Sequence, residues 1–168
     1  EIANRPAAAF RRDAVARTRI GIDHCNEPGF GQRRVLLRVK PAEVRPGRIL
    51  VVDDEPVVLE VLAGLLGLQG HEVETVGSGT AALEKIAAIS YDLIFSDVRM
   101  PGLDGPGLYR EISERHPALL ARLVYITGDT LSPDVEAFLS RTAVTCLAKP
   151  FVFDDLERVV GRFLSTGT

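Results

Sequence analysis

Tryptophan is absent from the sequence, methionine occurs once, and only two of the 168 residues are cysteines. Cys25 and Cys146 lie far apart, and neither belongs to a CxxC or a paired histidine motif. This spacing argues against a disulfide framework and against a zinc site. Long apolar runs are also missing, so the sequence predicts no segment of the about 20 residues that cross a bilayer. Because hydrophobic residues make up 46% and charged residues 26% of the chain, we expect a cytoplasmic globular protein with reduced thiols.

Charge divides the chain into two parts. Residues 1–48 hold eleven Arg and Lys against five Asp and Glu, whereas residues 49–168 hold nine against eighteen. We therefore expect a basic segment or linker over residues 1–46 and one domain over residues 47–168. The arginines of the segment are scattered among Ala, Pro and Gly without aromatic residues between them or a recognition helix, so we expect no nucleic-acid binding. The chain begins at Glu1 without a signal-peptide pattern, which indicates a piece of a longer protein.

From residue 48 onward, short β-rich runs alternate with longer amphipathic stretches. Five strands that are each followed by a helix predict βαβ units, and hence an α/β domain whose parallel sheet is covered on both faces. The expected strands are residues 49–52, 71–76, 93–96, 123–127 and 144–148. The expected helices are residues 56–68, 79–89, 107–115, 133–141 and 153–164.

Polar side chains follow the predicted strands at the edge where open parallel sheets bind their ligands. Asp53 and Asp54 come after the first strand and Asp97 after the third. Thr127 closes the fourth strand, and Lys149 follows the fifth. Since the carboxyl ends of parallel strands meet at one edge, we expect three carboxylates, a hydroxyl and an ammonium group to converge there.

Three crowded carboxylates need a cation, because like charges disfavour joint ionisation. Oxygen ligands without His or Cys indicate a hard ion, and a small protein ligand set with room for water favours Mg²⁺ over Ca²⁺. Together with Lys149 and the Thr127 hydroxyl, the ion would make a receptor for a phosphoryl group. Asp97 is central in this set and is the natural nucleophile for an acyl phosphate. Alternatively, Asp53 and Asp54 only favour the N-terminus of the following helix.

Four segments carry a family resemblance: "LVVDDE" (50–55), "DLIFSDVRMPGLDG" (92–105), "VYITGD" (124–129) and "CLAKPF" (146–151). In this order and at these spacings, they resemble the receiver domain of two-component response regulators over residues 47–165. The resemblance implies a flavodoxin-like (βα)5 fold, with five parallel strands in the order 2-1-3-4-5 and helices on both faces.

The same resemblance assigns roles to the residues at the sheet edge. It implies that Asp97 is the phosphoacceptor, that Thr127 is the switch hydroxyl and that Lys149 pairs with the phosphoryl group. Mg²⁺ would be held by Asp53 and Asp54, the latter directly, together with Asp97 and the backbone carbonyl of Arg99. The peptide bond between Lys149 and Pro150 is expected to be cis, which is uncommon in general.

Three further positions tune the output in this family. Cys146 stands where the family usually has an aromatic residue whose rotation accompanies the movement of the hydroxyl residue, which leaves the aromatic part of the signal open. Arg99 and Asp129 occupy variable positions that affect the lifetime of the phosphoryl group. Our hypothesis is that their opposite charges pair across the site and shield the acyl phosphate from water.

The segment before the domain weakly resembles the last hairpin of the ATP-binding domain of sensor histidine kinases, over residues 26–43. Only residues 165–168 follow the last helix, so we expect no DNA-binding domain after it. Together these features predict the C-terminal receiver of a hybrid histidine kinase, which would give the parent chain protein-histidine kinase activity. The fragment itself would be a phosphoacceptor with weak self-dephosphorylation, and its class as an enzyme stays open.

Two alternatives also stay open: a stand-alone single-domain response regulator, and a small Mg²⁺-dependent aspartyl phosphohydrolase. The latter class usually carries a second acid two residues after the nucleophile, where this chain has Arg99. The expected partner is a histidine kinase or a histidine phosphotransfer domain, without membrane contact by this segment; a receiver homodimer, the stimulus and the downstream reader are left open. The isolated histidines, His24, His71 and His116, are expected at the surface.

Overall fold

Strands and helices alternate along the computed structural model, which describes residues 44–129 and 132–165. The strands are β1 (Arg48–Val52), β2 (Glu72–Val76), β3 (Leu93–Asp97), β4 (Leu123–Thr127) and β5 (Thr145–Ala148). The helices are α1 (Pro56–Leu68), α2 (Gly79–Ala88), α3 (Gly105–Arg115), α4 (Pro133–Thr142) and α5 (Phe153–Leu164), and a 3-10 helix, η1 (Pro117–Arg122), precedes β4. All ten predicted elements are present, with ends within two residues of the prediction.

The five strands form one parallel sheet in the order β2-β1-β3-β4-β5. This is the order that the family resemblance implied, so the predicted fold class is confirmed. β3 and β4 are buried along their whole length, and β1 is buried from Ile49 to Val52. These are the strands whose continuous apolar runs indicated burial on both faces. β1 and β3 lie side by side near the centre of the sheet, which brings their carboxyl ends together.

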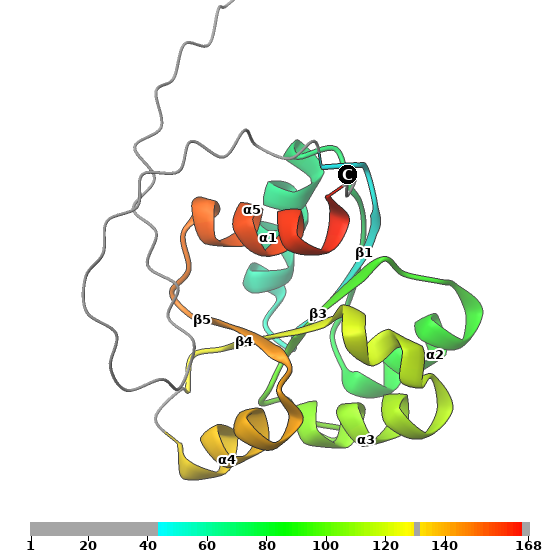
Figure 1. Cartoon of the computed structure of the whole chain (residues 1–168), viewed down its shortest axis with the longest axis vertical. Helices are drawn as coiled ribbons and strands as arrows, with labels where there is room; N and C mark the ends of the chain where they lie inside the picture. The colour runs from blue at the N-terminus through cyan, green and yellow to red at the C-terminus, as the bar shows by residue number, and fades with distance from the viewer. Residues whose placement is uncertain (1–43, 130–131, 166–168) are drawn as a thin grey trace, which may run out of the picture.

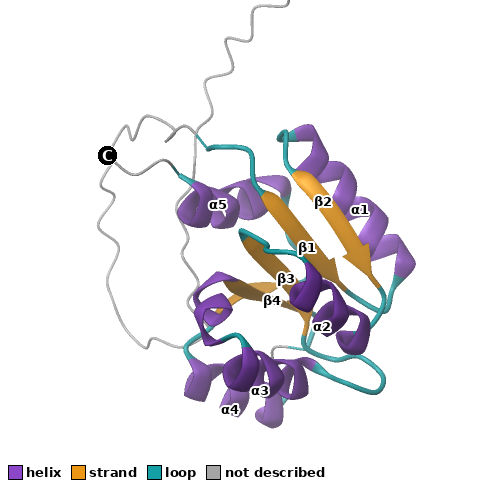
Figure 2. Cartoon of the chain, turned by 90° about the vertical axis from the view of Figure 1, so that its right-hand side faces the viewer, coloured by secondary structure: helices purple, strands orange, loops and turns teal. Residues whose placement is uncertain are grey.

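Helices cover both faces of the sheet. α1 and α5 lie on one face, and α2, α3 and α4 lie on the other (Figures 1 and 2). Successive side chains of β1 point to opposite faces, as strand geometry requires. Ile49 and Val51 therefore join the core beneath α1 and α5, whereas Leu50 and Val52 join the core beneath the other three helices. The two cores hold the sheet, and with it the loops at its carboxyl edge, from both sides.

Two local features differ from the expectation. α3 begins at Gly105 because the Asp104 side chain caps it, accepting a hydrogen bond from the Gly107 amide at 2.9 Å. A Cβ atom at Gly105 would lie 2.9 Å from the Cα atom of Val98, so close packing requires glycine there. His71 is buried rather than at the surface, because its Nδ1 accepts a hydrogen bond from the Gly47 amide at 3.2 Å. Burial also lowers the pKa of His71.

The described chain enters the domain beside its last helix. Val44 forms an antiparallel bridge with Ser165, and the Arg45 amide donates a hydrogen bond to the carbonyl of Leu164 at 3.1 Å. The first residues before β1 are thus attached to the end of α5. Predictions on His24, on Cys25 and on the hairpin of residues 26–43 lie outside the described residues.

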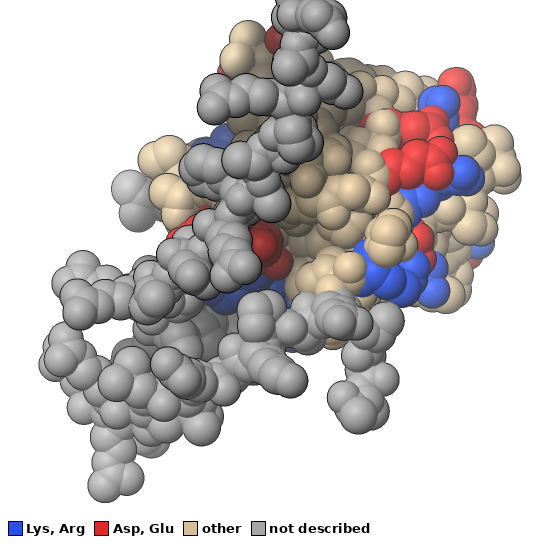
Figure 3. All heavy atoms as spheres, turned by 90° about the horizontal axis from the view of Figure 1, so that it is seen from above, with Lys and Arg blue, Asp and Glu red and all other residues tan. Residues whose placement is uncertain are grey.

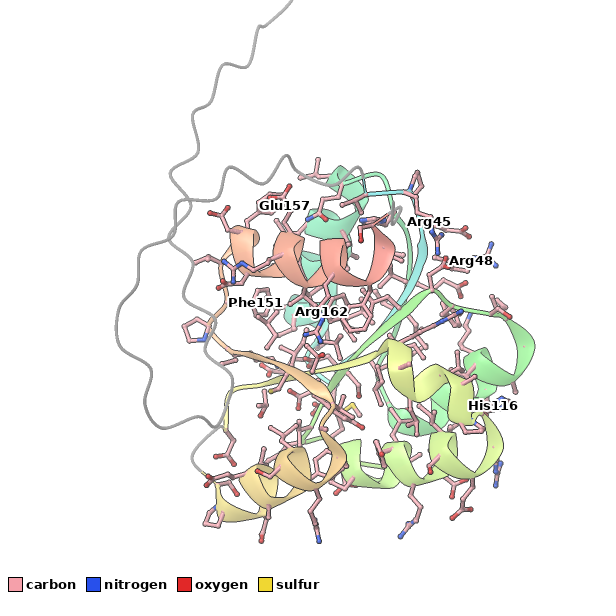
Figure 4. All side chains as sticks on the ribbon, in the orientation of Figure 1. Arg45, Arg48, His116, Phe151, Glu157 and Arg162 are labelled. Atoms are coloured by element: carbon pink, nitrogen blue, oxygen red, sulfur yellow. The ribbon has the colours of Figure 1, made fainter. Side chains whose placement is uncertain are left out.

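Ion pairs connect the strands at the end of the sheet opposite to the carboxyl edge. Arg45 contacts Asp92 at 2.7 Å, and Arg48 contacts Glu72 at 3.0 Å. Figure 4 shows both arginines where the chain enters β1, and basic and acidic atoms adjoin each other on the right-hand side of Figure 3. Water screens exposed pairs of this kind, so they add little to the stability of the fold. Within residues 44–129 and 132–165, no helix has both the length and the hydropathy that a membrane span requires.

Candidate functional site

Three of the predicted site residues meet at the carboxyl edge of the sheet. The Lys149 Nζ atom lies 2.8 Å from Asp53 Oδ2 and 3.1 Å from Asp97 Oδ1. A third acid, Glu55, approaches the same ammonium group at 3.7 Å. The side chains of Asp53 and Asp97 are only 2% and 10% exposed, whereas that of Glu55 is 67% exposed. One ammonium group therefore balances two buried carboxylates, which leaves the site with an excess of negative charge.

Backbone amides hold both buried carboxylates in place. Asp53 Oδ1 accepts a hydrogen bond from the Glu55 amide at 2.9 Å, and Asp97 Oδ2 accepts one from the Arg99 amide at 2.8 Å. Burial raises the pKa of Asp97, and the opposing effects of Lys149 and of the Arg99 amide do not cancel it. Burial alone would lower the pKa of Lys149, but its hydrogen bond to Asp53 and its attraction to Asp97 outweigh burial and raise it. Lys149 is therefore cationic at neutral pH.

The turn after β5 positions Lys149. The peptide bond between Lys149 and Pro150 is cis, as the resemblance implied, and the Lys149 amide donates a hydrogen bond to the carbonyl of Thr127 at 2.7 Å. Phe151 packs against the core beneath α1 and α5, and Figure 4 shows it below α5 where β5 leaves the sheet. An apolar anchor thus lies two residues after the lysine and attaches this turn to the core.

Thr127 lies at the end of β4 and is 1% exposed. Its Oγ1 atom accepts a hydrogen bond from the amide of Asp129 at 3.1 Å. The hydroxyl proton stays available as a donor, because a hydroxyl group both donates and accepts. The Thr127 carbonyl thus contacts the Lys149 amide, and the Thr127 hydroxyl contacts the Asp129 amide.

The predicted pairing of Arg99 with Asp129 is present. Nε of Arg99 lies 2.8 Å from Oδ2 of Asp129, and Nη2 of the same side chain donates a hydrogen bond to Ser132 Oγ at 2.7 Å. Arg99 and Asp129 are 57% and 43% exposed, so the pair lies at the rim of the site. It joins the loop after β3 to the loop after β4, across the position of Asp97.

Cys146 lies on β5 opposite Tyr125 of β4 and packs partly buried against the core beneath α2, α3 and α4. The aromatic side chains of this region belong to other positions. The ring of Phe138 contacts Tyr125 at 5.3 Å and Tyr109 at 5.8 Å between ring centroids, both in edge-to-face geometry. The Tyr125 hydroxyl donates a hydrogen bond to the carbonyl of Gly105 at 2.7 Å.

Asp54 differs from the other acids because its side chain is exposed. No group of three or more His, Cys, Asp or Glu side chains in the described part of the chain is arranged to hold a metal ion by itself. A hard ion at this edge would therefore take Asp54 and Asp97 together with the Arg99 carbonyl and water. Mg²⁺ accepts such a set, since it keeps several waters and takes one or two carboxylates. The residues present fit this ion, and the excess negative charge around Asp53 favours it.

Two contacts of the site were not predicted from the sequence. Glu55 reaches Lys149, and Ser132 accepts a hydrogen bond from Arg99. Glu55 adjoins the aspartate pair, and Ser132 directly precedes a proline at the start of a helix, which is a signature of an N-cap residue. Neither pattern indicates which side chain across the site will be contacted.

The sheet order, two buried acids that share one lysine, and a hydroxyl at the next strand end define a receiver-type α/β domain. The chain belongs to the response regulator receiver domain family, whose family model matches residues 49–161. The domain is thus a receiver of two-component signalling, a class that accepts phosphoryl groups from histidine kinases or phosphotransfer domains.

Relatives of the domain occur in different kinds of protein. Over 112 residues the chain is 34% identical to the sensor histidine kinase RcsC of Salmonella typhi, a match that covers 67% of this chain and 12% of RcsC. Over 119 residues it is 34% identical to the DNA-binding transcriptional regulator NtrC of Escherichia coli K12, covering 71% of this chain and 25% of NtrC. The chain therefore spans only a small part of these relatives.

A solved receiver structure shows the same fold with a metal ion. The receiver domain of sensor histidine kinase PA1611 from Pseudomonas aeruginosa PAO1 has a magnesium ion coordinated in its active site cleft. It is 31% identical to this chain with a TM-score of 0.65, and the match covers 71% of this chain and 98% of that domain.

Proposed function

We propose that this domain accepts a phosphoryl group from a phosphohistidine onto Asp97. The observation that carries the proposal is the 3.1 Å contact between Lys149 Nζ and the carboxylate of an acid that is 10% exposed. A carboxylate oxygen of Asp97 attacks phosphorus, the P–N bond to the imidazole breaks, and its electron pair stays on the imidazole nitrogen. Lys149 lies within reach of the transferred group and neutralises part of its charge.

Mg²⁺ is the proposed cofactor. Asp54, Asp97 and the Arg99 carbonyl would hold the ion directly, and Asp53 would act through water. When bound, the ion neutralises charge on the phosphoryl oxygens. Lys149 keeps the remaining negative charge of the two buried acids in balance while the phosphoryl group enters.

Thr127 and the pair of Arg99 with Asp129 are proposed to act after the transfer. The Thr127 hydroxyl, whose proton is available, donates a hydrogen bond to a phosphoryl oxygen. The pair of Arg99 and Asp129, joined at 2.8 Å at the rim of the site, hinders water from reaching the acyl phosphate. Alanine at either position is expected to speed the loss of the phosphoryl group, and unchanged decay rates in both variants would remove this proposal.

For the whole protein we propose a hybrid sensor histidine kinase, with residues 47–168 as its receiver and residues 1–46 as a linker or a remnant of the kinase. The match to RcsC supports this layout. A response regulator that carries its receiver alone stays as the alternative. The phosphohydrolase alternative is disfavoured, because Arg99 pairs with Asp129 at the position where that class carries an acid. The donor would be a histidine kinase or a phosphotransfer domain, and placement in the cytoplasm stays a prediction.

The test is intact-mass spectrometry after treatment with acetyl phosphate and Mg²⁺. The wild type is expected to gain one phosphoryl group, and Asp97→Ala to gain none. Asp134→Ala, which removes an exposed acid of α4, serves as the matched control and should gain the group as the wild type does. Chelation of Mg²⁺ should prevent the gain of the phosphoryl group in the wild type and in Asp134→Ala. No adduct on the wild type, together with no binding of beryllofluoride and Mg²⁺, would contradict the proposal.

A further inference from the structure

The first turn of α4 lacks the cap that its sequence provides. Ser132 occupies the N-cap position with an extended backbone (φ −71°, ψ 124°). A serine at this position normally accepts a hydrogen bond from a backbone N–H of the first turn. Here the Oγ atom of Ser132 makes no such bond and instead accepts one from Nη2 of Arg99 at 2.7 Å. Arg99 thus diverts the capping side chain from its helix.

Arg99 is also directly connected to the phosphoacceptor. Its amide donates a hydrogen bond to Asp97 Oδ2 at 2.8 Å, and its Nε pairs with Asp129 at 2.8 Å. A guanidinium group carries five N–H bonds, so donors remain for a further acceptor. One side chain therefore links the loop of Asp97 to the residue that begins α4.

Because these contacts meet at one guanidinium, and taking the proposed function as given, we propose that phosphorylation of Asp97 exchanges the partner of Ser132. A phosphoryl oxygen is a charged acceptor, so its contact with the guanidinium group adds an attraction between opposite charges that the neutral hydroxyl of Ser132 does not provide. Nη2 of Arg99 turns from the neutral hydroxyl of Ser132 to the phosphoryl group, whereas Nε keeps its charged partner, Asp129. The released Ser132 Oγ then accepts a hydrogen bond from the amide of Asp134 or Val135 and caps α4.

The change of partner of Ser132 couples the site to the core beneath α4. Val135, in the first turn, is 4% exposed and belongs to the same core cluster as Phe138. Phe138 in turn contacts the rings of Tyr125 and Tyr109. The first turn of α4 therefore shares a core with side chains of β4 and α3, so a change in its order can reach both elements.

Hydrogen–deuterium exchange of the complete 168-residue chain tests the proposal. Beryllofluoride with Mg²⁺ serves as a stand-in for the phosphoryl group. In the wild type, it is expected to slow the exchange of the Asp134 and Val135 amides about five-fold, the effect of a typical serine cap. Ser132→Ala should abolish the slowing, whereas Ser132→Thr should retain it, because threonine also caps. Ser140→Ala, an exposed serine further along α4, is the matched control and should behave as the wild type.

A second variant separates this proposal from the proposed function. In Arg99→Ala, Ser132 has lost its competing partner, so the same two amides should exchange about five-fold more slowly even without beryllofluoride. Failure of beryllofluoride to bind the wild type would contradict phosphorylation of Asp97. The Arg99→Ala result would still decide whether Arg99 prevents Ser132 from capping α4. Two results would overturn the proposed change of partner of Ser132. One is that beryllofluoride still slows hydrogen exchange in Ser132→Ala, and the other is that the two amides exchange at the wild-type rate in Arg99→Ala.

Discussion

Replacing Lys149 by methionine should destabilise the fold strongly, because the substitution leaves two buried acids without their cation. Methionine keeps much of the length of the side chain but removes its charge. The ammonium group lies 2.8 Å from Asp53 and 3.1 Å from Asp97, whose side chains are 2% and 10% exposed. We expect the effect to appear in the absence of Mg²⁺.

The magnitude follows from these distances. Each contact corresponds to about 5 to 6 kcal/mol of attraction at an effective dielectric constant of about 20. Desolvation of the ammonium group offsets several kcal/mol of this gain, and breaking a buried ion pair costs about 3 to 5 kcal/mol in general. Because Lys149 keeps 19% exposure, the loss should lie at the lower end of that range. We expect the free energy of unfolding to fall by about 3 kcal/mol at pH 7.

The loss should also depend on pH. Burial raises the pKa of Asp97, and without Lys149 one of the effects that oppose this rise is gone. An acid whose pKa is raised by folding favours the folded state below its unfolded pKa, and this contribution is lost as the pH rises through the folded pKa. The difference between wild type and variant should therefore be largest at neutral pH and shrink as the pH falls toward the ordinary pKa of aspartate.

Urea unfolding followed by far-ultraviolet circular dichroism measures both effects, since the chain has no tryptophan. Lys85→Met is the matched control: Lys85 pairs with Glu74 at 2.7 Å, but the two side chains are 43% and 24% exposed. Its loss should not exceed about 1 kcal/mol. Equal losses in the two variants, or a Lys149→Met deficit that does not change with pH, would refute the reasoning.

The remaining predictions concern packing and acid stability. Gly79→Ala should lower the free energy of unfolding by about 2 kcal/mol or more, because its Cβ would clash with the backbone oxygen of Leu103. Gly64→Ala, in open space within α1, should raise the free energy of unfolding by about 0.5 to 1 kcal/mol. Thermal unfolding compares the two variants, and a shift of the unfolding temperature in the same direction for both would contradict the packing argument. The Arg45 guanidinium, by its hydrogen bond, holds the pKa of Asp92 below its ordinary value, so this acid stabilises the fold above that value and loses its effect as the pH falls through the folded pKa. Asp92→Asn should lower the free energy of unfolding by about 1 kcal/mol at neutral pH, and the variant should lose less stability than the wild type as the pH falls. An equal loss of stability in acid for the two proteins would contradict this prediction.

The fold could be predicted because short apolar runs alternate with amphipathic helical stretches along the chain. The apolar runs of β1, β3 and β4 require burial on both faces, and only a parallel sheet between two helix layers supplies that. The same logic located the site, since Asp53 and Lys149 directly follow a strand and Asp97 ends one, and the carboxyl ends of these strands meet at one edge.

The unpredicted features depend on contacts between segments that are distant in the sequence. Nothing around Ser132 distinguishes a cap that serves its own helix from one that is diverted to Arg99. An isolated histidine carries no periodic pattern, so the burial of His71 against Gly47 had no signal in the sequence. The 3-10 helix η1 is likewise a short turn whose hydrogen bonds depend on the surrounding loops.

The bridge between Val44 and Ser165 has a consequence for how such a domain is built into larger proteins. Because paired strands lie about 5 Å apart, the entrance and the exit of the described fold are separated by about one strand spacing. A host protein needs to open a loop by only that width to admit the receiver as an insertion. Joining the two ends by a short linker would likewise allow the chain to be cut elsewhere, for example at the positive-φ turn of Gly70, without changing the order of the sheet.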